Sequence, residues 1–397
     1  MFYVGVDIAK ADHMIGGIDE AGATILEPFK AANNTEGFAR ILKGFAKVGI
    51  TADNCAVGME ATGHYWLSVF EFLCDHGFAV SVINPIQTDA FRDVLSIRKT
   101  KTDAIDCVLI ADLLRFGGFE PSSVADESVQ ALKQLTRFRT ALVVETTALK
   151  NKATAILDRI FPEYCSVFTQ PFGEGSRELL KKFPSPEEIA GTDIRTLTST
   201  LSKASKNKLG RDEAHRLKEL AKSSVGTSYA TKGLAFELKQ VIERIAFTDG
   251  QVASLEDEIE VVLEDTQGKW LTSIKGIGTT LAAVIIAELG DASLFENEHS
   301  VMAFAGMDPS KMQSGQFDGD QGSMSKRGSP HLRRALMLAA DCVRKWDPYF
   351  GDYYDKMIAR GKHHYVALSG VARKLIAVML VLMKQERPYE PAPPKRS

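Results

Sequence analysis

The first 125 residues alternate between the two-residue hydrophobic period of strands and the longer period of helices. Residues 2–8 read as a strand with Val4, Val6 and Ile8 on one face and Gly5 and Asp7 on the other. Further strands are predicted at residues 13–18, 24–29, 54–60 and 78–83. Helices are predicted at 34–46, with Asn34 as the N-cap, at 65–75, and in two segments ending near residue 116, where the glycine pair 117–118 closes the unit. Three successive strands followed by alternating helices and strands predict a mixed sheet flanked by helices.

Two heptad repeats occupy the middle of the chain. The first consists of Leu135, Leu142, Leu149 and Ile156, and the second of Leu238, Ile245, Val252 and Ile259. Alanines repeat beside the first series at 141, 148 and 155. This pattern predicts an antiparallel coiled coil or an oligomerising stalk, with two core helices of a bundle as the alternative. The insertion between the repeats, at about 165–228, holds a lysine- and arginine-rich stretch that is either a nucleic-acid contact or a solvated charged face.

These patterns divide the chain into an α/β part and a helical part. We expect an α/β domain at 1–125, a coiled-coil region with its basic insertion at 126–265, and a helical domain at 266–397. A glycine-rich stretch at 312–328 interrupts the last domain, and the end, PYEPAPPKRS, is typical of a disordered tail.

Composition narrows the class of protein without naming a function. The chain has 397 residues, 45% of them hydrophobic and 25% charged, and a net charge of -3. Nucleic-acid binding would therefore depend on local basic patches. Five scattered cysteines without CxxC spacing argue against a zinc site or a disulfide framework. The start shows no signal peptide, and the longest apolar run, 375–383, is too short to span a bilayer. We expect a cytoplasmic, nucleoid-associated protein without membrane contact.

Four acidic residues stand where a mixed sheet would bring them together. Asp7 lies in the first predicted strand, Glu60 ends the fourth, and Asp103 and Asp106 lie three residues apart in a late helix. That spacing places both helix carboxylates on one face. In a ribonuclease-H-like sheet these elements converge at one edge, where clustered carboxylates need a compensating cation. The sequence therefore predicts a site for two Mg²⁺ ions, or Mn²⁺ in their place, that acts on a phosphodiester.

A glycine-containing turn near residue 276 indicates a grip on nucleic acid. The segment LTSIKGIGTTLAAVIIAELG looks like a helix-hairpin-helix unit in which Gly276 and Gly278 open the turn. Backbone N–H groups at the start of the following helix can hold a phosphate, and Lys275 adds charge. Such units grip the DNA backbone without reading sequence. A helix pair packed only for structure is the alternative.

A polar loop farther along carries hydroxyl groups beside positive charge. Ser314 precedes a glycine in this loop, and Ser323 and Ser325 follow. The basic residues after the loop are Lys326, Arg327, Arg333 and Arg334. These cations could neutralise a phosphate in a transition state. By chemistry alone, such a serine is more often a phosphate contact than a nucleophile.

Motifs at both ends of the chain together resemble one family. They are GVDIAK, EATGHY, VSVINP, KTDAID and the block SGQFDG…SMSKRG…LRRAL. In this order, over residues 1–120 and 266–385, they resemble the IS110 family of insertion-sequence transposases, with its IS1111 group. The resemblance implies a RuvC-like domain with a DEDD acidic set, joined to a transposase domain with a serine nucleophile.

The resemblance also assigns residues and partners. By motif, the acids are the four named above and the serine is Ser314. The loop departs from the family pattern in the acidic stretch 316–321, so Ser323 and Ser325 remain alternatives. The family further implies double-stranded donor and target DNA, a structured non-coding guide RNA, and a homo-oligomer from dimer to tetramer. Its reaction would pass through a phosphoserine intermediate.

Three other functions deserve comparison. A Holliday-junction-type endonuclease with a RuvC-like fold would use the same acids to activate water. A non-catalytic nucleic-acid scaffold would need neither the acids nor the serine. An actin-like nucleotide-binding protein would need a glycine-rich phosphate loop after the first strand, and the segment IAKADHM lacks one.

Overall fold

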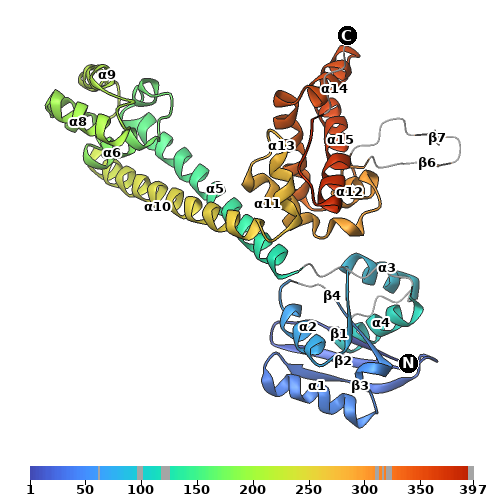
Figure 1. The fold of residues 1–397 in the computed structure, drawn as a ribbon. Helices are drawn as coiled ribbons and strands as arrows, with labels where there is room; N and C mark the ends of the chain where they lie inside the picture. The colour runs from blue at the N-terminus through green and yellow to red at the C-terminus, as the bar shows by residue number, and fades with distance from the viewer. Residues whose placement is uncertain are drawn as a thin grey trace. The chain divides into compact units, whose positions relative to one another are not determined.

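The chain forms two compact units, Met1–Val124 and Ala125–Ser397. The computed structural model describes residues 1–60, 63–95, 102–117, 126–308, 313–314, 317–318 and 324–391. The N-terminal unit is a sheet flanked by helices (Figure 1). The described part of the C-terminal unit is helical apart from a short strand pair. The division into an α/β part and a helical part agrees with the sequence pattern.

Five strands form the mixed sheet of the N-terminal unit, in the order β3-β2-β1-β4-β5. β1 and β2 are antiparallel, as are β2 and β3, whereas β1, β4 and β5 run parallel. The strands are β1 (Phe2–Asp7), β2 (Asp12–Ile18), β3 (Thr24–Ala32), β4 (Cys55–Glu60) and β5 (Ala79–Ile83). The helices are α1 (Thr35–Lys47), α2 (Trp66–Asp75), α3 (Pro85–Leu95) and α4 (Asp103–Phe116), with a 3-10 turn, η1 (Ala52–Asn54), before β4.

Different helices cover the two faces of this sheet, as the alternation within β1 requires. Val4 and Val6 are fully buried in a cluster with Ile41 of α1 and Leu73 of α2. On the other face, Tyr3 packs against the buried residues of α4. The alternation predicted for this strand is therefore confirmed, and the odd-numbered residues of β1 face α4.

Polar residues fix the helix ends of this unit. Asn34, the predicted N-cap of α1, accepts a hydrogen bond from the Gly37 amide at 2.9 Å. Thr102 caps α4 in the same way, through the Ile105 amide. Gly117 ends α4 at a φ of 68°, in the left-handed region that favours glycine. The glycine pair at 117–118 was predicted to close the unit at this point.

Two long helices carry the heptad repeats of the C-terminal unit. They are α5 (Glu127–Ile160) and α10 (Thr231–Leu263). They run antiparallel. Along three ion pairs between them, the residue numbers increase in α5 and decrease in α10: Arg139–Glu256, Glu145–Arg244 and Lys152–Glu237. Leu142, Leu149 and Ile156 are buried as the repeat predicted. The alanine series is exposed, so those alanines do not line the contact between α5 and α10.

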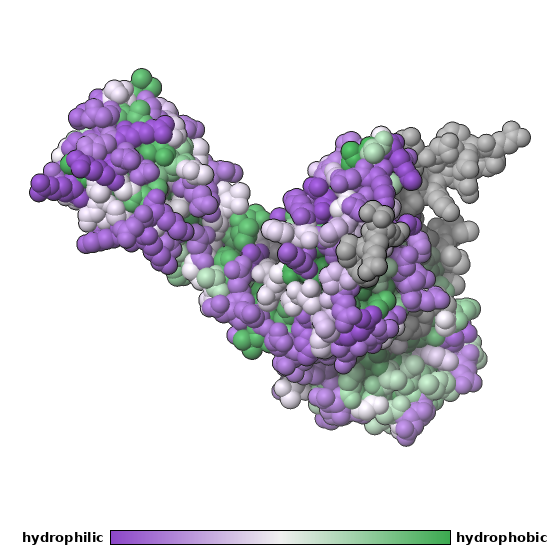
Figure 2. All heavy atoms as spheres, turned by 45° about the horizontal axis from the view of Figure 1, so that its top comes forward, coloured by the Kyte–Doolittle hydropathy of each residue, from purple (hydrophilic) through white to green (hydrophobic). Residues whose placement is uncertain are grey.

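The insertion between the two long helices is itself helical. Its elements are η2 (Tyr164–Val167), α6 (Glu174–Lys182), α7 (Pro186–Gly191), α8 (Ile194–Ala204) and α9 (Arg211–Lys222). These elements share one hydrophobic cluster with the last turns of α5 and the first turns of α10. The surface of the insertion visible in Figure 2, at the upper left, is mainly hydrophilic.

A second helical cluster forms the rest of this unit. Its elements are η3 (Gln267–Ser273), α11 (Thr279–Leu289), η4 (Ala292–Leu294), α12 (Glu298–Phe304), β6 (Gln313–Ser314), β7 (Phe317–Asp318), α13 (Pro330–Trp346), α14 (Pro348–Ala359) and α15 (His364–Gln385). The helices among them pack with the first turns of α5 and the last turns of α10. α15 is long and apolar enough to span a membrane by length and composition, but 56% of its most apolar stretch is buried in the protein. It is the core helix of this cluster.

Candidate functional site

Two of the four acids end neighbouring parallel strands. Val6 of β1 pairs with Met59 of β4, and the next residue along each strand is Asp7 or Glu60. Neighbouring strands lie about 4.8 Å apart, and paired residues of parallel strands point to the same face. Glu60 also pairs with Ile83 of β5. The predicted positions of Asp7 and Glu60, at the carboxyl ends of adjacent strands, are therefore confirmed.

The other two acids lie at the start of the helix that crosses these strands. A Cβ atom on Gly5 would stand 1.8 Å from the Cys107 carbonyl oxygen, so the backbone of α4 lies directly on β1. A Cβ on Gly58 of β4 would meet Leu114 at 2.8 Å. Since Asp7 lies two residues beyond Gly5 on the same face, it points toward the first turn of α4. That turn carries Asp103 and Asp106.

A small cavity confirms that acids from the strand and the helix meet. It has a volume of about 150 Å³, and its lining includes Asp7 and Asp103 together with Asp12 and Lys30. Burial first, and then the negative charges of Asp7 and Asp106, together raise the pKa of Cys107 to about 12. Carboxylates from β1 and α4 therefore share one neighbourhood.

Asp106 is held by a residue that the sequence did not reveal. Arg92 of α3 donates to Asp106 Oδ1 at 3.0 Å and to Asp89 at 2.6 Å. The Asp106 side chain is 8% exposed, and Arg92 supplies the positive charge that compensates this buried carboxylate. Arg92 lies fourteen residues before Asp106, on another helix, and no sequence period links the two.

Oxygen ligands of this kind suit a hard divalent cation. Across the described residues, however, no three His, Cys, Asp or Glu side chains lie close enough together to hold a metal ion as they stand. The ion pair of Asp106 with Arg92 accounts for one of the predicted ligands. A metal held by all four acids would therefore either bind Asp106 through Oδ2 or displace Arg92 from Oδ1.

The polar loop with the candidate serines lies between Asp308 and Ser325 and is called the serine loop below. Its two ends meet in a closely packed base. Asp308 and Ser325, at the two ends of the loop, are joined by a backbone hydrogen bond and by one from the Ser325 hydroxyl to the Asp308 carboxylate. Lys326 donates its amide to the Gly306 carbonyl oxygen at 2.9 Å. A Cβ on Gly328 would stand 1.8 Å from a backbone oxygen of α12, so no side chain fits there.

This base separates the three candidate serines. Ser325 belongs to it and is partly buried. Ser314 lies in β6 and pairs with Phe317 of β7. Ser323 lies outside the described residues.

The four basic residues after the loop differ in their surroundings. Lys326, Arg327 and Arg334 are exposed, as a phosphate contact requires. Arg333 is partly buried and donates to the Ala305 carbonyl oxygen at 3.0 Å, so it helps to hold the base of the loop.

A buried carboxylate anchors the helix that follows the loop. Glu288 of α11 accepts two hydrogen bonds from Arg137 of α5, at 2.8 and 3.1 Å, and one from the Ser329 hydroxyl at 2.7 Å. Ser329 is the N-cap of α13. Burial alone would raise the pKa of Glu288, but the hydrogen bonds from Arg137 and Ser329 outweigh it, and the pKa lies below its usual value. A charged residue at the end of the apolar run AAVIIAEL was the available signal for Glu288.

The predicted phosphate-binding turn is a tight one. Gly276 has a φ of 107°, and a Cβ there would stand 3.1 Å from the Cys342 backbone. Gly278 is the N-cap of α11, and a Cβ there would have no described atom within 4 Å. The Lys275 amine lies 5.4 Å from the ring centre of Trp346. The element before the turn is the seven-residue 3-10 helix η3.

Sequence comparisons cover both units. A profile of DEDD transposases of IS110 elements, described as Transposase, matches residues 4–162. A second profile, described as Transposase IS116/IS110/IS902 family, matches residues 268–355. The first match contains all four acids, and the second contains the turn at 275–278, the serine loop and the basic residues after it.

Individual relatives align over nearly the whole chain. A protein of insertion element IS116 from Streptomyces clavuligerus is 25% identical over 99% of this chain and 97% of its own length. A protein of insertion element IS110 from Streptomyces coelicolor is 27% identical, with coverages of 98% and 95%. A pilin gene-inverting protein from Moraxella lacunata is 23% identical, with coverages of 98% and 97%. Two family profiles in order and relatives of matching length lead to one conclusion: the chain belongs to the IS110 family of transposases.

Proposed function

We propose that this transposase cuts and rejoins DNA by attack of the Ser314 hydroxyl on a phosphodiester positioned by Asp7, Glu60, Asp103 and Asp106. The observation that carries this proposal is the crossing of α4 over β1 and β4, which places these acids at one end of the sheet. An N-terminal unit of this kind would act as a RuvC-like, ribonuclease-H-like domain.

The four acids would hold Mg²⁺ or Mn²⁺, and two ions are expected. When bound, the metal would supply charge that stabilises the attacking and leaving oxygens of the phosphodiester. Asp7 and Asp103 already line one cavity, whereas Asp106 would exchange its ion pair with Arg92 for metal binding. Arg92, once released, carries a charge suited to a DNA phosphate.

The serine would form the covalent bond to DNA. Its Oγ attacks phosphorus and gives its proton to solvent. The bond from phosphorus to the departing DNA oxygen breaks, and that oxygen takes up a proton and leaves as a hydroxyl. The resulting phosphoserine keeps the energy of the phosphodiester for rejoining, when a DNA hydroxyl attacks phosphorus and serine leaves. Lys326 and Arg327, exposed at the end of the loop, would neutralise the phosphate. Ser325 is engaged by Asp308 at the base of the loop, which favours Ser314 over it.

The remaining parts would bind nucleic acid and assemble subunits. We assign residues 1–125 to the nuclease domain, 126–265 to a coiled-coil region and 266–397 to the serine domain. Lys275, Gly276 and Gly278 would grip a DNA backbone as a helix-hairpin-helix turn. A structured guide RNA would select donor and target DNA, and a dimer or tetramer would join acids and serine from different subunits.

Covalent capture of DNA tests this proposal. The full chain, element RNA and labelled DNA are incubated with Mg²⁺, and the products are separated under denaturing conditions. We expect a protein–DNA adduct from the unchanged chain and from Ser325→Ala, but none from Ser314→Ala or Asp7→Asn. Peptide mapping of the adduct should place the phosphate on Ser314.

Other outcomes would contradict the proposal in distinct ways. An adduct that survives Ser314→Ala would remove the nucleophile assignment. Clean nicks without any adduct, in both the unchanged chain and Ser314→Ala, would favour a nuclease that activates water. Full recombination by Asp7→Asn would remove the role of the acids.

A further inference from the structure

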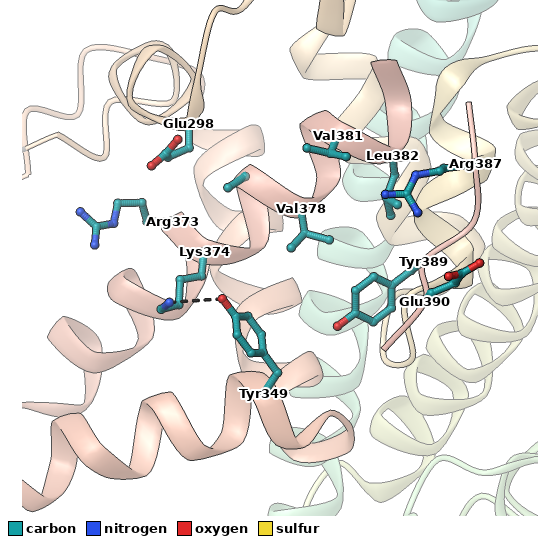
Figure 3. A pocket seen from close by; sticks show the side chains of 11 residues that line it. Glu298, Tyr349, Arg373, Lys374, Val378, Val381, Leu382, Arg387, Tyr389 and Glu390 are labelled. Carbon is teal, nitrogen blue, oxygen red and sulfur yellow. Dashed lines mark hydrogen bonds between the residues drawn. The ribbon is translucent and has the colours of Figure 1, made fainter. Parts of the chain in front are cut away.

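A pocket beside α15 is lined by apolar and aromatic side chains and by charged ones. Its volume is about 500 Å³, within the range of small-ligand sites. Val378 and Val381 of α15 form an apolar floor, and the rings of Tyr349 and Tyr389 stand beside it (Figure 3). Flat aromatic ligands suit such a floor and walls, because ring faces and aliphatic groups pack against them.

Positive charge lies at both ends of this pocket. Figure 3 shows Arg373 and Lys374 at one end and Arg387 at the other, with the floor between them. Arg373 makes no hydrogen bond or ion pair with any residue that the structure describes. Glu298 and Glu390 also line the pocket, so the lining carries a single net positive charge. A ligand with one aromatic group and a phosphodiester on either side matches this order of groups.

Hydrogen bonds hold the tyrosine walls in place, Tyr389 from outside the pocket and Tyr349 from within it. Tyr389 donates its hydroxyl to Asp347 at 2.8 Å and its amide to the Ser273 hydroxyl at 2.8 Å. Burial, followed by the nearby Asp347 carboxylate, raises the pKa of Tyr389 above its usual value, so the ring stays neutral. The Tyr349 hydroxyl accepts a hydrogen bond from Lys374 at 3.3 Å. The pocket is therefore formed before any ligand arrives.

Trp346 offers another exposed ring close in sequence to Tyr349 of the pocket. Trp346 ends α13 and is 59% exposed, and Tyr349, three residues later, is 46% exposed. Each ring has a lysine amine above it: Lys275 lies 5.4 Å from the Trp346 ring centre, and Lys374 lies 5.2 Å from that of Tyr349. Lys275 belongs to the turn proposed above to hold a phosphate. Exposed rings interleaved with cations are typical of surfaces that bind unpaired nucleic acid.

We infer that Trp346, Tyr349 and the adjoining pocket bind an unpaired strand, with one base stacked on Trp346 and one nucleotide seated in the pocket. The bases lie against the rings and the valine floor, while Arg373 and Arg387 contact the phosphates flanking the seated nucleotide. The site is suited to strands that open during recombination, or to a single-stranded part of an RNA, because both present unstacked bases. It goes beyond the proposed function, since it needs neither Ser314 nor a metal.

Binding of short labelled oligonucleotides to the full chain tests this inference. Fluorescence anisotropy compares a single-stranded DNA, an RNA of the same sequence and the corresponding DNA duplex, all without divalent metal. We expect Trp346→Ala and Arg373→Ala each to weaken single-strand binding about tenfold, and duplex binding less than about twofold. Arg373→Ala should also lower the salt dependence of single-strand binding by about 0.7 in slope.

Matched variants separate the site from general effects of charge and aromatic surface. Arg360→Ala removes an exposed arginine of α14–α15 outside the pocket, and Tyr365→Ala removes an exposed ring of the same unit. Both should bind as the unchanged chain does. Val381→Glu adds a negative charge to the exposed floor and should act like Arg373→Ala, even if Trp346→Ala proves unstable in circular dichroism.

The outcomes decide between occupants. Weaker binding of DNA alone, or of RNA alone, identifies the strand that the site takes. Equal losses for duplex and single strand would overturn the inference in favour of a general backbone contact. Binding by Arg373→Ala and Val381→Glu equal to that of Arg360→Ala would also overturn it, as would an unchanged chain that binds no single strand. Ser314→Ala should bind normally, so this result stands apart from the test of the serine.

Discussion

Arg137 donates two hydrogen bonds to the carboxylate of Glu288, from Nε to Oε1 at 2.8 Å and from Nη2 to Oε2 at 3.1 Å. The residues lie 151 positions apart in the sequence. Through Ser329, the same carboxylate caps the helix that follows the serine loop. A contact between α5 and α11 therefore fixes one end of the loop that carries the proposed nucleophile.

Glu288→Ala should destabilise the C-terminal unit by about 2–4 kcal/mol, because Arg137 and Ser329 lose a buried charged partner. Arg137→Ala should cost about as much, because it leaves the Glu288 carboxylate, whose side chain is only 2% exposed, without its cation. Thermal denaturation of both single variants and the double variant measures the coupling. Additive effects would show that the two side chains do not act together.

The pH dependence of this contact follows from its sign. The folded chain holds the pKa of Glu288 below its ordinary value of 4.5. The contribution to stability is therefore complete above about pH 4.5 and is lost as the pH falls through the lowered pKa. Glu288→Gln should flatten that part of the stability profile in acid titrations. An unchanged profile would place the acid sensitivity elsewhere.

Gly5→Ala should disrupt the N-terminal unit although it changes no charge. The added methyl would overlap the Cys107 carbonyl oxygen and push α4 from the sheet, at a cost of about 3 kcal/mol. Gly250→Ala, in an exposed helical position with open space around it, should stabilise slightly. Melting temperatures of both variants check this contrast. A Gly5→Ala variant with an unchanged melting temperature and full recombination activity would contradict the close packing of α4 on β1.

Arg92→Ala should make the N-terminal unit more dependent on divalent metal. Without metal, the buried Asp106 loses its counter-charge, and stability should fall by about 2–4 kcal/mol. Mg²⁺ should then raise the melting temperature more in this variant than in the unchanged chain. Arg115→Ala, which breaks the Asp112 ion pair on the same helix, serves as the control. Equal metal-induced shifts in all three proteins would refute competition between Arg92 and metal.

His13 should make the N-terminal unit sensitive to mild acid. Burial lowers its pKa from the ordinary 6.5, and nearby Asn33 and Asp12 offset only part of the effect. The unfolded chain therefore binds a proton more readily below about pH 6.5, and the free energy of unfolding falls as the pH drops. His13→Phe should remove this slope in urea denaturation between pH 5 and 7. A slope that persists would assign it to another group.

The sequence predicted local structure best where one periodicity dominated. The alternation in β1 placed Val4 and Val6 in the core and Asp7 on the other face, and the capping role of Asn34 was also correct. The positions of the four acids in their elements were predictable for the same reason. The alanine series beside the first heptad did not locate the contact between α5 and α10, because a repeat of small residues does not reveal which face meets that helix.

Long-range partners were beyond the reach of the sequence. Arg92 holds Asp106 from another helix, and Arg137 holds Glu288 across more than a hundred residues. Arg333 was expected on nucleic acid but turns back to Ala305. The pocket on α15 joins residues from α12, α14, α15 and the segment after it. Such pairings depend on how helices pack, and no spacing within one element encodes them.

α5 belongs to both hydrophobic clusters of the C-terminal unit, one at each of its ends. A helix of 34 residues is about 50 Å long, so its two anchored ends are far apart. Arg137 lies nearer the N-terminal end of this helix, and the insertion follows its C-terminal end. Because α5 is one continuous helix, a displacement of the insertion would reach Arg137 and shift the buried carboxylate of Glu288. The base of the Ser314 loop, which is tied to Glu288 through Ser329, would then move without any ligand touching the loop.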